Sequence, residues 1–389
     1  MPSGPAGRPL VVAGLFAGVG GIELGLHKAG HSTRLLCEIE PGACAVLEER
    51  FGGVPLHQDI RTLRAVSKDV EMIAAGFPCQ DLSQAGLTRG IDGAQSGLVS
   101  HVFELLQQRR VPWVLLENVP FMLQLNRGRA LDYVLSAIER LGYKWAYRVI
   151  DSRAFGLPQR RERVYIVASL DHDPRRVLFA GDEEPTELDR DSRTACGFYW
   201  TEGIRGLGWA VDAVPTLKGG STVGIASPPA IWMPDGRIVK PDIRDAERLQ
   251  GFTANWTAPA EAVTRRGFRW KLVGNAVTVD VARWLGDRLL KLDGRESPEE
   301  YPLRPGAPWP KSACNVGSGR FGAIVSTWPV RRKARPLAKF LRFPAEPLSA
   351  KAAAGFLART RVSSLRFPPG FIDAIEAHLD RMRSTAAAA

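Results

Sequence analysis

Residues 9–30, PLVVAGLFAGVGGIELGLHKAG, set the fold of this 389-residue chain. The opening PLVVAGLF has the apolar, β-branched composition of a buried strand. The glycines of GLFAGVGG permit a tight turn, and GGIELGLHKAG continues as a helix that ends at a glycine. A strand, a glycine-rich turn and a helix in this order begin an α/β unit. Such a turn lets backbone amides approach a ligand at the start of the helix.

The same alternation of strands and helices continues over the first 170 residues. Strands are predicted at TRLLCEIE, VPLHQDI, VEMIAAGF, VPWVLLENV, YKWAYRVIDS and ERVYIVASL. Helices are predicted at GACAVLEERFGG, SGLVSHVFELLQQRR and RALDYVLSAIERLG. Alternation of this regularity predicts a doubly wound, mostly parallel α/β sheet.

The pattern changes twice after these elements. The sequence becomes rich in Gly, Pro, Asp, Arg and Thr, and we expect a small, loop-rich second domain over residues 171–269. Helical periodicity returns in DVARWLGDRLLKL, so residues 270–290 are expected to complete the first domain, residues 1–170. Residues 291–389 contain the proline-rich segment RESPEEYPLRPGAPWPK and are predicted to form a basic C-terminal extension.

The chain is basic, with 52 Lys and Arg against 41 Asp and Glu and a formal net charge of +11. Residues 291–389 hold 17 of the basic side chains against 8 acidic ones, a surplus of 9. A basic surplus favours polyanionic partners such as nucleic acid, although composition alone identifies none. We therefore expect the extension to add non-specific affinity for phosphates. The alternative is an ordinary surface-exposed helical domain.

The five cysteines are odd in number, widely spaced and free of any CxxC pair. This pattern disfavours a disulfide framework or a zinc site, and we expect no bound metal. The N-terminus lacks the features of a secretory signal, and no stretch approaches the roughly 18 apolar residues of a membrane span. These observations predict a cytoplasmic location without membrane contact.

Candidate cofactor-binding residues follow the first three predicted strands. Gly18 lies in the turn after the first strand, Glu38 ends the second, and Asp59 ends the third. A carboxylate about 20 residues beyond a glycine turn is typical of one that binds ribose hydroxyls. The turn alone could be purely structural, but three such strand ends in order favour a cofactor site. The lack of a Walker lysine disfavours hydrolysis of a nucleoside triphosphate.

Reactive side chains follow the later strands. Cys79, in GFPCQDLS, precedes a glycine-rich stretch typical of a mobile lid, and it is either a nucleophile or a buried structural cysteine. Glu117, in LLENV, is either an exposed acid or a functional one in the crevice at the strand ends. Gln159, Arg161 and Arg163 alternate on one strand face. They form either a solvated edge or a triplet of donors aimed at an oxygen or a phosphate.

Taken in order, LFAGVGG, CEIE, HQDI, GFPCQDLS, LLENV, QRRERV, RDAERLQGF and KLVGNAVTVDVA resemble the motifs of the bacterial DNA (cytosine-5) methyltransferases. The Pro-Cys-Gln, Glu-Asn-Val and Gln-x-Arg-x-Arg elements together are highly specific. The chain departs from the family pattern at Gly14, where Asp is frequent, and at Gln95, Thr253 and Asp280. The resemblance implies a Rossmann-like class I methyltransferase that uses S-adenosylmethionine and releases S-adenosylhomocysteine.

The resemblance also implies roles for individual residues. Cys79 would attack C6 of a flipped cytosine, and Glu117 would hold its N3 and exocyclic amine. Arg161 and Arg163 would orient the cytosine O2 and support Glu117. The cofactor-binding residues would be Phe16, Ala17, Gly18, Gly20, Gly21, Glu38, Ile39, Asp59, Ile60, Pro78, Asn275 and Ala276. The DNA-binding residues would be Gln80, Ser83, Gln159, Thr216 and Lys218.

Double-stranded DNA is the implied substrate, with residues 171–269 as the target-recognition domain. The resemblance further implies a monomer at the bacterial nucleoid, in a restriction–modification or orphan modification system, with a cognate restriction endonuclease as a potential partner. One alternative is an RNA cytosine-5 methyltransferase, which the PCQ context disfavours. The other is a non-catalytic DNA-binding regulator, which the intact catalytic residues disfavour. The target sequence itself follows no code that these loops reveal.

Overall fold

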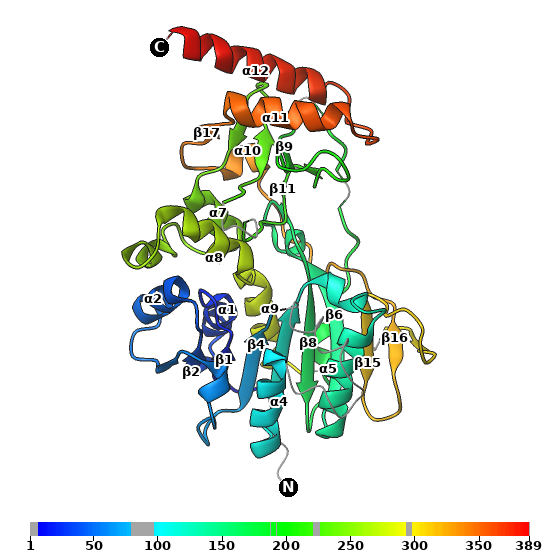
Figure 1. Cartoon of the computed structure of the whole chain (residues 1–389). Coiled ribbons are helices and arrows are strands. Elements are labelled where there is room, and N and C mark those ends of the chain that lie inside the picture. Colours follow the sequence, from blue (N-terminus) through cyan, green and yellow to red (C-terminus); the bar gives the residue numbers. More distant parts are fainter. Residues whose placement is uncertain are drawn as a thin grey trace. The chain divides into compact units, whose positions relative to one another are not determined.

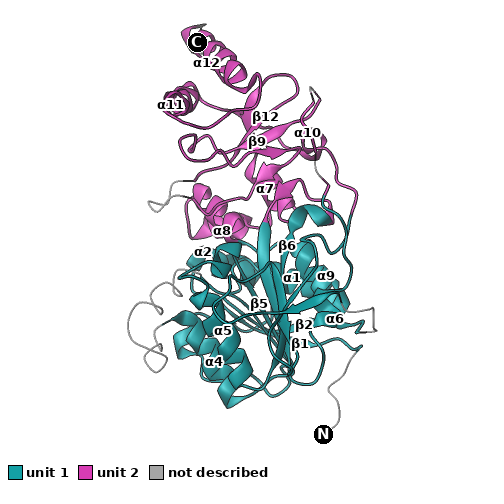
Figure 2. Ribbon diagram, turned by 90° about the vertical axis from the view of Figure 1, so that its right-hand side faces the viewer, with its two compact units in different colours: residues 1–154, 162–185, 276–331 teal, residues 155–161, 186–275, 332–389 magenta. Residues whose placement is uncertain are grey.

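The computed structural model describes residues 7–78, 97–186, 188–191, 193–220, 226–292 and 298–388. The chain forms two compact units, each assembled from segments that are distant in the sequence (Figure 2). Unit 1 comprises residues 1–154, 162–185 and 276–331, and unit 2 comprises residues 155–161, 186–275 and 332–389. Within the described ranges, no helix is long and apolar enough to cross a membrane.

Unit 1 contains a ten-stranded sheet (Figure 1). Its strands are β1 Val11–Leu15, β2 Ser32–Cys37, β3 Leu56–His57, β4 Met72–Gly76, β5 Trp113–Asn118, β6 Lys144–Asp151, β8 Glu162–Ser169, β14 Glu300–Pro302, β15 Ser312–Asn315 and β16 Phe321–Ala323. They lie in the order β14-β16-β15-β6-β8-β5-β4-β1-β2-β3. Strands β3, β2, β1, β4 and β5 are parallel, and β8 runs antiparallel between β5 and β6.

Helices cover both faces of this sheet. They are α1 Gly21–Lys28, α2 Pro41–Arg50, α4 Leu98–Gln108, α5 Arg129–Arg140, α6 Arg175–Leu178 and α9 Val279–Leu289. Figure 2 shows α4 and α5 on one face and α1, α6 and α9 on the other. Every residue of β5 is buried, as expected for a strand covered on both faces. The structure confirms the predicted doubly wound, mostly parallel α/β fold.

Residues 298–331 extend the sheet of unit 1. Strand β15 pairs antiparallel with β6, and β16 and β14 continue the sheet beyond it. Without β15, the β6 strand would present an open row of backbone donors and acceptors, which proteins usually cover. This part of the predicted extension is therefore built into the main sheet rather than attached to its surface.

Unit 2 contains a second, five-stranded antiparallel sheet in the order β10-β9-β12-β13-β17. These strands are β9 Cys196–Phe198, β10 Ala210–Val211, β12 Ala230–Trp232, β13 Ile238–Lys240 and β17 Glu346–Pro347. A separate parallel pair joins β7 Gln159–Arg160 to β11 Val214–Pro215. The helices are α7 Ile243–Leu249, α8 Arg269–Asn275, α10 Leu337–Phe340, α11 Ala350–Arg361 and α12 Phe371–Ala388.

The C-terminal helices supply much of the core of unit 2. The ring of Phe371, at the start of α12, lies 4.9 Å from that of Phe198 and 5.1 Å from that of Trp209, measured between centroids. Phe356 of α11 packs 5.4 Å from Phe198 in the same cluster. Residues 332–388 thus complete a hydrophobic core whose other half comes from residues 186–275, and aromatic residues of this size dominate the energy of such cores.

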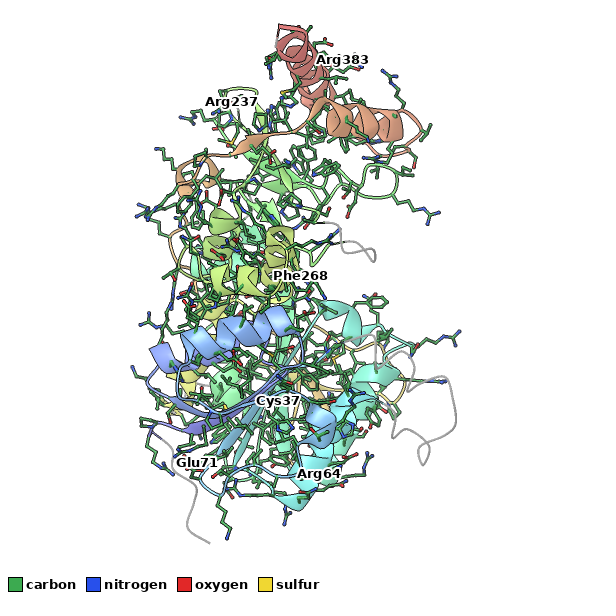
Figure 3. All side chains as sticks on the ribbon, turned by 60° about the vertical axis from the view of Figure 1, so that its left-hand side comes forward. Cys37, Arg64, Glu71, Arg237, Phe268 and Arg383 are labelled. Carbon is green, nitrogen blue, oxygen red and sulfur yellow. The ribbon has the colours of Figure 1, made fainter. Side chains whose placement is uncertain are left out.

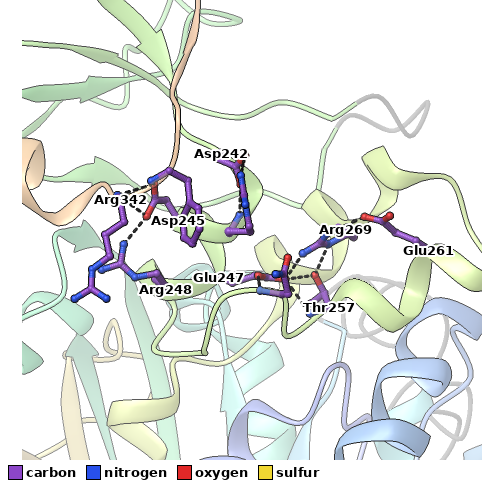
Figure 4. Close-up of polar contacts among 11 residues, drawn as sticks. Asp242, Asp245, Glu247, Arg248, Thr257, Glu261, Arg269 and Arg342 are labelled. Atoms are coloured by element: carbon purple, nitrogen blue, oxygen red, sulfur yellow. Dashed lines mark hydrogen bonds and ion pairs between the residues drawn. The ribbon is translucent and has the colours of Figure 1, made fainter.

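Charged residues of the RDAERLQGF motif form a buried network of hydrogen bonds and ion pairs within unit 2 (Figure 4). Asp245 accepts hydrogen bonds from Arg248 and from the backbone amide of Arg342. Glu247 is fully buried, and its Oε1 accepts from Arg269 at 2.7 Å and from the backbone amide of Thr257 at 2.8 Å. Because both acids are paired inside the unit, we assign the motif a structural role.

Candidate active site

A left-handed turn joins β1 to α1. Phe16, Gly18 and Gly20 have φ angles of 53°, 56° and 80°, in the region that favours glycine. A Cβ atom at Gly21 would lie 2.4 Å from the carbonyl oxygen of Val277, so only glycine fits there. The backbone that follows Ala276 therefore passes directly over the start of α1. Residues from the two ends of the family-like region therefore meet at this turn.

Glu38, at the end of β2, holds the turn in place. Its Oε2 accepts a hydrogen bond from the amide of Gly18 at 2.7 Å. Its Oε1 accepts from the amides of Ile39 and Glu40, each at 2.9 Å. An ionised carboxylate has about four acceptor positions, so Glu38 can still accept from ribose hydroxyls. A Cβ at Gly18 would meet no atom within 4 Å, which leaves open space over the turn for a ligand.

The predicted adenine-binding residues differ in exposure. Ile39 is 61% exposed, whereas the side chain of Ile60 is buried. Asp59 caps the short helix at Ile60–Thr62 and accepts hydrogen bonds from the guanidinium of Arg61. These hydrogen bonds lower the pKa of Asp59 to about 2. The turn is thus bordered by two acidic side chains, those of Glu38 and Asp59, which suits a cationic cofactor.

Glu117 lies at the carboxyl end of β5, beside the glycine turn. Glu117 is 8% exposed, and the Nε of Arg163, on β8, lies 3.1 Å from its Oε1. Its Oε2 would lie 3.5 Å from a Cβ at Gly76, the last residue of β4. The same Cβ would lie 3.8 Å from Val277 and 4.0 Å from the carbonyl oxygen of Phe16. The predicted acid and its predicted arginine therefore pair within unit 1, next to the turn.

Asn118, which the predicted site omitted, fixes the end of β4. Its Nδ2 donates to the carbonyl oxygen of Phe77 at 3.0 Å, and its Oδ1 accepts from the amide of Val119 at 2.8 Å. This side chain thereby links the ends of two adjacent strands. The polar residue directly after Glu117 was the sequence signal for this role.

Pro78 is exposed, and the predicted Cys79, Gln80 and Ser83 lie outside the described residues.

Gln159 and Arg161 belong to unit 2, where their side chains bind backbone. Gln159 is fully buried; its Nε2 donates to the carbonyl oxygen of Leu249 at 2.9 Å, and its Oε1 accepts from the amide of Leu217 at 3.0 Å. Because this amide is sequestered inside the unit, we no longer expect Gln159 to contact DNA. Arg161 is buried too, and its Nη1 donates to the carbonyl oxygens of Leu217 and Gly274, both at 3.2 Å.

The VPTLKGG segment packs on Gly274 and Asn275, the part of the GNAV motif that belongs to unit 2. A Cβ at Gly274 would lie 2.3 Å from the backbone of Lys218, and one at Gly219 would lie 2.6 Å from the Oδ1 of Asn275. The Thr216 hydroxyl donates to the carbonyl oxygen of Arg160 at 2.8 Å. Lys218 forms an ion pair with Glu202, and its Nζ lies over the ring of Tyr199, 4.1 Å from the ring centroid. Arg161 therefore acts in this structure as the tie between the two segments.

Comparisons with known proteins identify relatives of this sequence. The sequence model of the C-5 cytosine-specific DNA methylases matches residues 10–194. The chain is 48% identical to Type II methyltransferase M2.BsuMI of Bacillus subtilis over 95% of its length and 98% of that protein. It is 29% identical to Type II methyltransferase M.DsaV of Dactylococcopsis salina over 74% of its length and 88% of that protein.

Solved structures share the fold at low sequence identity. The Dnmt2 methyltransferase of S. pombe superposes with a TM-score of 0.52 at 18% identity, covering 72% of this chain and 98% of its own. The methyltransferase EhMeth of Entamoeba histolytica gives a TM-score of 0.52 at 14% identity, with coverage of 72% and 98%. Together with the sequence match over nearly the whole chain, these findings confirm the resemblance carried by the motifs. The chain belongs to the C-5 cytosine-specific DNA methylase family.

Proposed function

We propose that the chain transfers a methyl group from S-adenosylmethionine to C5 of a cytosine that is flipped out of double-stranded DNA. The observation that carries this proposal is the Glu117–Arg163 pair beside the glycine turn, at 3.1 Å. One edge of unit 1 thus offers a cradle for a cationic nucleoside and, next to it, an acid that can donate to a ring nitrogen. The bound donor supplies an electrophilic methyl group on a sulfonium sulfur.

The reaction begins with the substrate ring, because cytosine C5 is a weak nucleophile. The thiolate of Cys79 adds to C6, and Glu117 donates a proton to N3, which neutralises the charge that the addition creates. The electron-rich C5 then takes the methyl group. Loss of the C5 proton, expulsion of the Cys79 thiolate and return of the N3 proton to Glu117 restore the aromatic ring and the acid. Arg163 fixes the orientation of Glu117, and Asn118 fixes the strand end that leads to Cys79.

The biological setting proposed is that of a Type II modification methyltransferase, the name that M2.BsuMI and M.DsaV carry. In this setting the chain acts as a monomer and protects the target of a cognate restriction endonuclease. Residues 171–269 select the target sequence. Arg161 donates hydrogen bonds to the segments at Leu217 and Gly274. It would therefore position this region and would not contact the base.

The activity is tested by incubating the purified chain with S-adenosylmethionine labelled in the methyl group and unmethylated bacterial DNA. We expect label in 5-methylcytosine after digestion and mass spectrometry of the nucleosides. Transfer RNA added as competitor should not accept label, which separates this function from the RNA alternative. Unlabelled DNA at stoichiometric enzyme would refute the proposal, and sequencing of the methylated sites in the same sample would read the target.

The C-terminal residues contribute to a basic cavity of about 450 Å³ in unit 1. Arg127 and Arg129 at the start of α5 line it together with Arg304, and none of the three has a carboxylate partner among the described residues. Trp309 closes one wall and donates its indole Nε1 to the carbonyl oxygen of Gly128 at 3.1 Å. The cavity lies beside the start of α5, the helix that follows β5 in the chain. We propose that it binds a phosphate of the DNA backbone.

Replacing Arg127, Arg129 and Arg304 together by alanine should flatten the salt dependence of DNA binding. Each lost phosphate contact lowers the slope of log Kd against log salt by about 0.9, so the triple variant should lose up to about 2.7. Fluorescence anisotropy with a labelled duplex at several salt concentrations measures this slope. Point variants are needed because removing residues 291–389 would also remove β15 and the helices that complete unit 2.

The matched control is a triple alanine variant at Arg64, Lys68 and Arg110, which changes the charge equally. These side chains are exposed, and they precede β4 and β5, at the amino ends of the parallel strands; Arg64 is labelled in Figure 3. This variant should keep the wild-type slope. Equal slopes for the cavity variant and the wild type would remove the cavity from the DNA interface.

A further inference from the structure

One buried acid in unit 1 has no role in the chemistry described so far. Glu23 lies in the first turn of α1 and is 1% exposed. Neither of its carboxylate oxygens accepts a hydrogen bond from another residue among those described. Buried polar groups in folded proteins are nearly always hydrogen-bonded, so an acid in this state calls for a partner that the chain itself does not supply.

The position of Glu23 is fixed by Gly14. A Cβ at Gly14 would lie 2.1 Å from the Oε1 of Glu23 and 2.9 Å from its Cδ, so the carboxylate fills the space above this glycine. Gly14 is in β1, two residues before the left-handed Phe16 that opens the turn. The carboxylate therefore lies between β1 and α1, against the strand residue that leads into the glycine turn.

The electrostatic setting of Glu23 favours a cation. Burial raises the pKa of Glu23 to about 8, its own backbone amide acts in the opposite direction, and the carboxylate of Glu38 adds to the increase. Glu38, at the end of β2, is the charged group that the structure places against it, and it is itself bonded to the amide of Gly18. The nearby thiols of Cys37 and Cys44 stay neutral, because burial raises their pKa values to about 12 and about 11.

From this placement we propose that Glu23 is the counter-ion of the α-ammonium group of S-adenosylmethionine. The inference rests on the proposed function and names one further cofactor-binding residue. An unpaired carboxylate in this position is neutral in the free protein, since ionising it away from water is costly. A cation in the turn makes the ionised form favourable, so Glu23 releases its proton to the solvent as the cofactor binds. Two acids, Glu23 against Gly14 and Glu38 at the edge of the turn, then offset the positive charges of the ligand.

The test is Glu23→Gln, which keeps the shape of the neutral acid but cannot ionise. Titration calorimetry with S-adenosylhomocysteine should show at least about tenfold weaker binding than in the wild type, the scale of one charge-assisted hydrogen bond. Repeating the titration at pH 7 in two buffers of different ionisation enthalpy counts the protons released. The wild type should release close to one proton and the variant none.

Two ligands and two further variants make the result specific. 5′-Methylthioadenosine lacks the amino-acid part of the cofactor, so Glu23→Gln should leave its affinity unchanged. Glu48→Gln, an exposed acid on α2, changes the charge equally and should bind S-adenosylhomocysteine as the wild type does. The double variant Gly14→Asp/Glu23→Ala moves the carboxyl from helix to strand within the same space and should restore affinity.

Three outcomes would overturn the inference. Equal affinity of wild type and Glu23→Gln for S-adenosylhomocysteine would do so, as would equal proton release. An equal loss of affinity for 5′-methylthioadenosine would show that the substitution damages the turn as a whole. Thermal unfolding without ligand checks that the variant is folded. If the wild type itself binds no S-adenosylhomocysteine, the proposed function fails instead, whatever Glu23 does.

Discussion

Cys79→Ala is expected to abolish methylation of cytosine while leaving the binding of S-adenosylmethionine intact. The thiolate is required to activate C5, so the loss should be on the order of 10⁶-fold in turnover, as when other enzymes lose a covalent nucleophile. The glycine turn and Glu38 make no use of this side chain, so affinity for the cofactor should change less than about twofold. Methyl-label incorporation measures the first effect, and titration calorimetry with S-adenosylhomocysteine measures the second.

The remaining thiols support this assignment. Cys37, Cys44, Cys196 and Cys314 are all buried, and burial raises their pKa values to between about 11 and about 12. Figure 3 labels Cys37, at the end of β2. At neutral pH these four groups are almost entirely protonated, and a thiol attacks carbon only as its thiolate. Among five cysteines, Cys79 is therefore the one we expect to act as a nucleophile.

A matched control and a trapping experiment sharpen the test. Cys314→Ala removes a buried thiol from β15 and should methylate DNA at close to the wild-type rate. Duplex DNA that carries 5-fluorocytosine cannot lose its C5 substituent, so the wild type and Cys314→Ala should form a covalent complex that survives denaturing electrophoresis. Cys79→Ala should form none. Turnover of Cys79→Ala within tenfold of the wild type would contradict the proposed mechanism.

The central sheet was predictable from sequence because its signals are local. Strands β1, β4 and β5 are short, mostly apolar runs, and helices separate most of the parallel strands along the chain. Parallel strands buried on both faces produce such runs. Because crossover connections between parallel strands nearly always have one hand, the order of the strands in the chain limits their order in space.

The placement of residues 291–389 could not be predicted, because it depends on contacts between distant segments. Strand β15 has only four residues and β17 only two, too few to show a period in sequence. Their positions are decided by which edges remain open, β6 in unit 1 and β13 in unit 2. The surplus of basic residues describes the composition of this region. It does not indicate that the region contributes to the packing of both unit 1 and unit 2.

The candidate site was predicted unevenly. Glu117 and Arg163 come from different strands, and their motifs indicated a pair that the structure places at 3.1 Å. Gln159 and Arg161 share the alternation of Arg163, but alternation does not reveal that the chain passes from unit 2 to unit 1 between Arg161 and Glu162. Glu23 also had a sequence signal, since it is an acid on the otherwise apolar face of its helix. A single charge on such a face is a candidate for a buried partner.

Glu117→Gln is expected to lower turnover by about 10²–10⁴-fold with little change in the affinity for S-adenosylhomocysteine. Glutamine can hold a similar shape but cannot donate a proton to N3, so the loss should fall in the addition step rather than in cofactor binding. Single-turnover methylation with enzyme in excess over DNA measures that step directly. Glu162→Gln is the matched control, because Glu162 is adjacent to Arg163 on β8 and pairs with Lys311 at the surface. It should retain wild-type turnover.

The role of Arg163 in this step is tested by combining substitutions. Arg163→Lys keeps the charge but cannot reproduce the Nε contact to Oε1 at 3.1 Å, so the carboxyl group loses its fixed orientation. If Arg163 acts through Glu117, the double variant Glu117→Gln/Arg163→Lys should be no slower than Glu117→Gln alone, because the second change removes support from a group that no longer donates. Multiplicative losses would instead mean that Arg163 contacts the cytosine independently. Wild-type turnover of Glu117→Gln would remove the acid from the mechanism altogether, and the proton for N3 would then have to come from solvent.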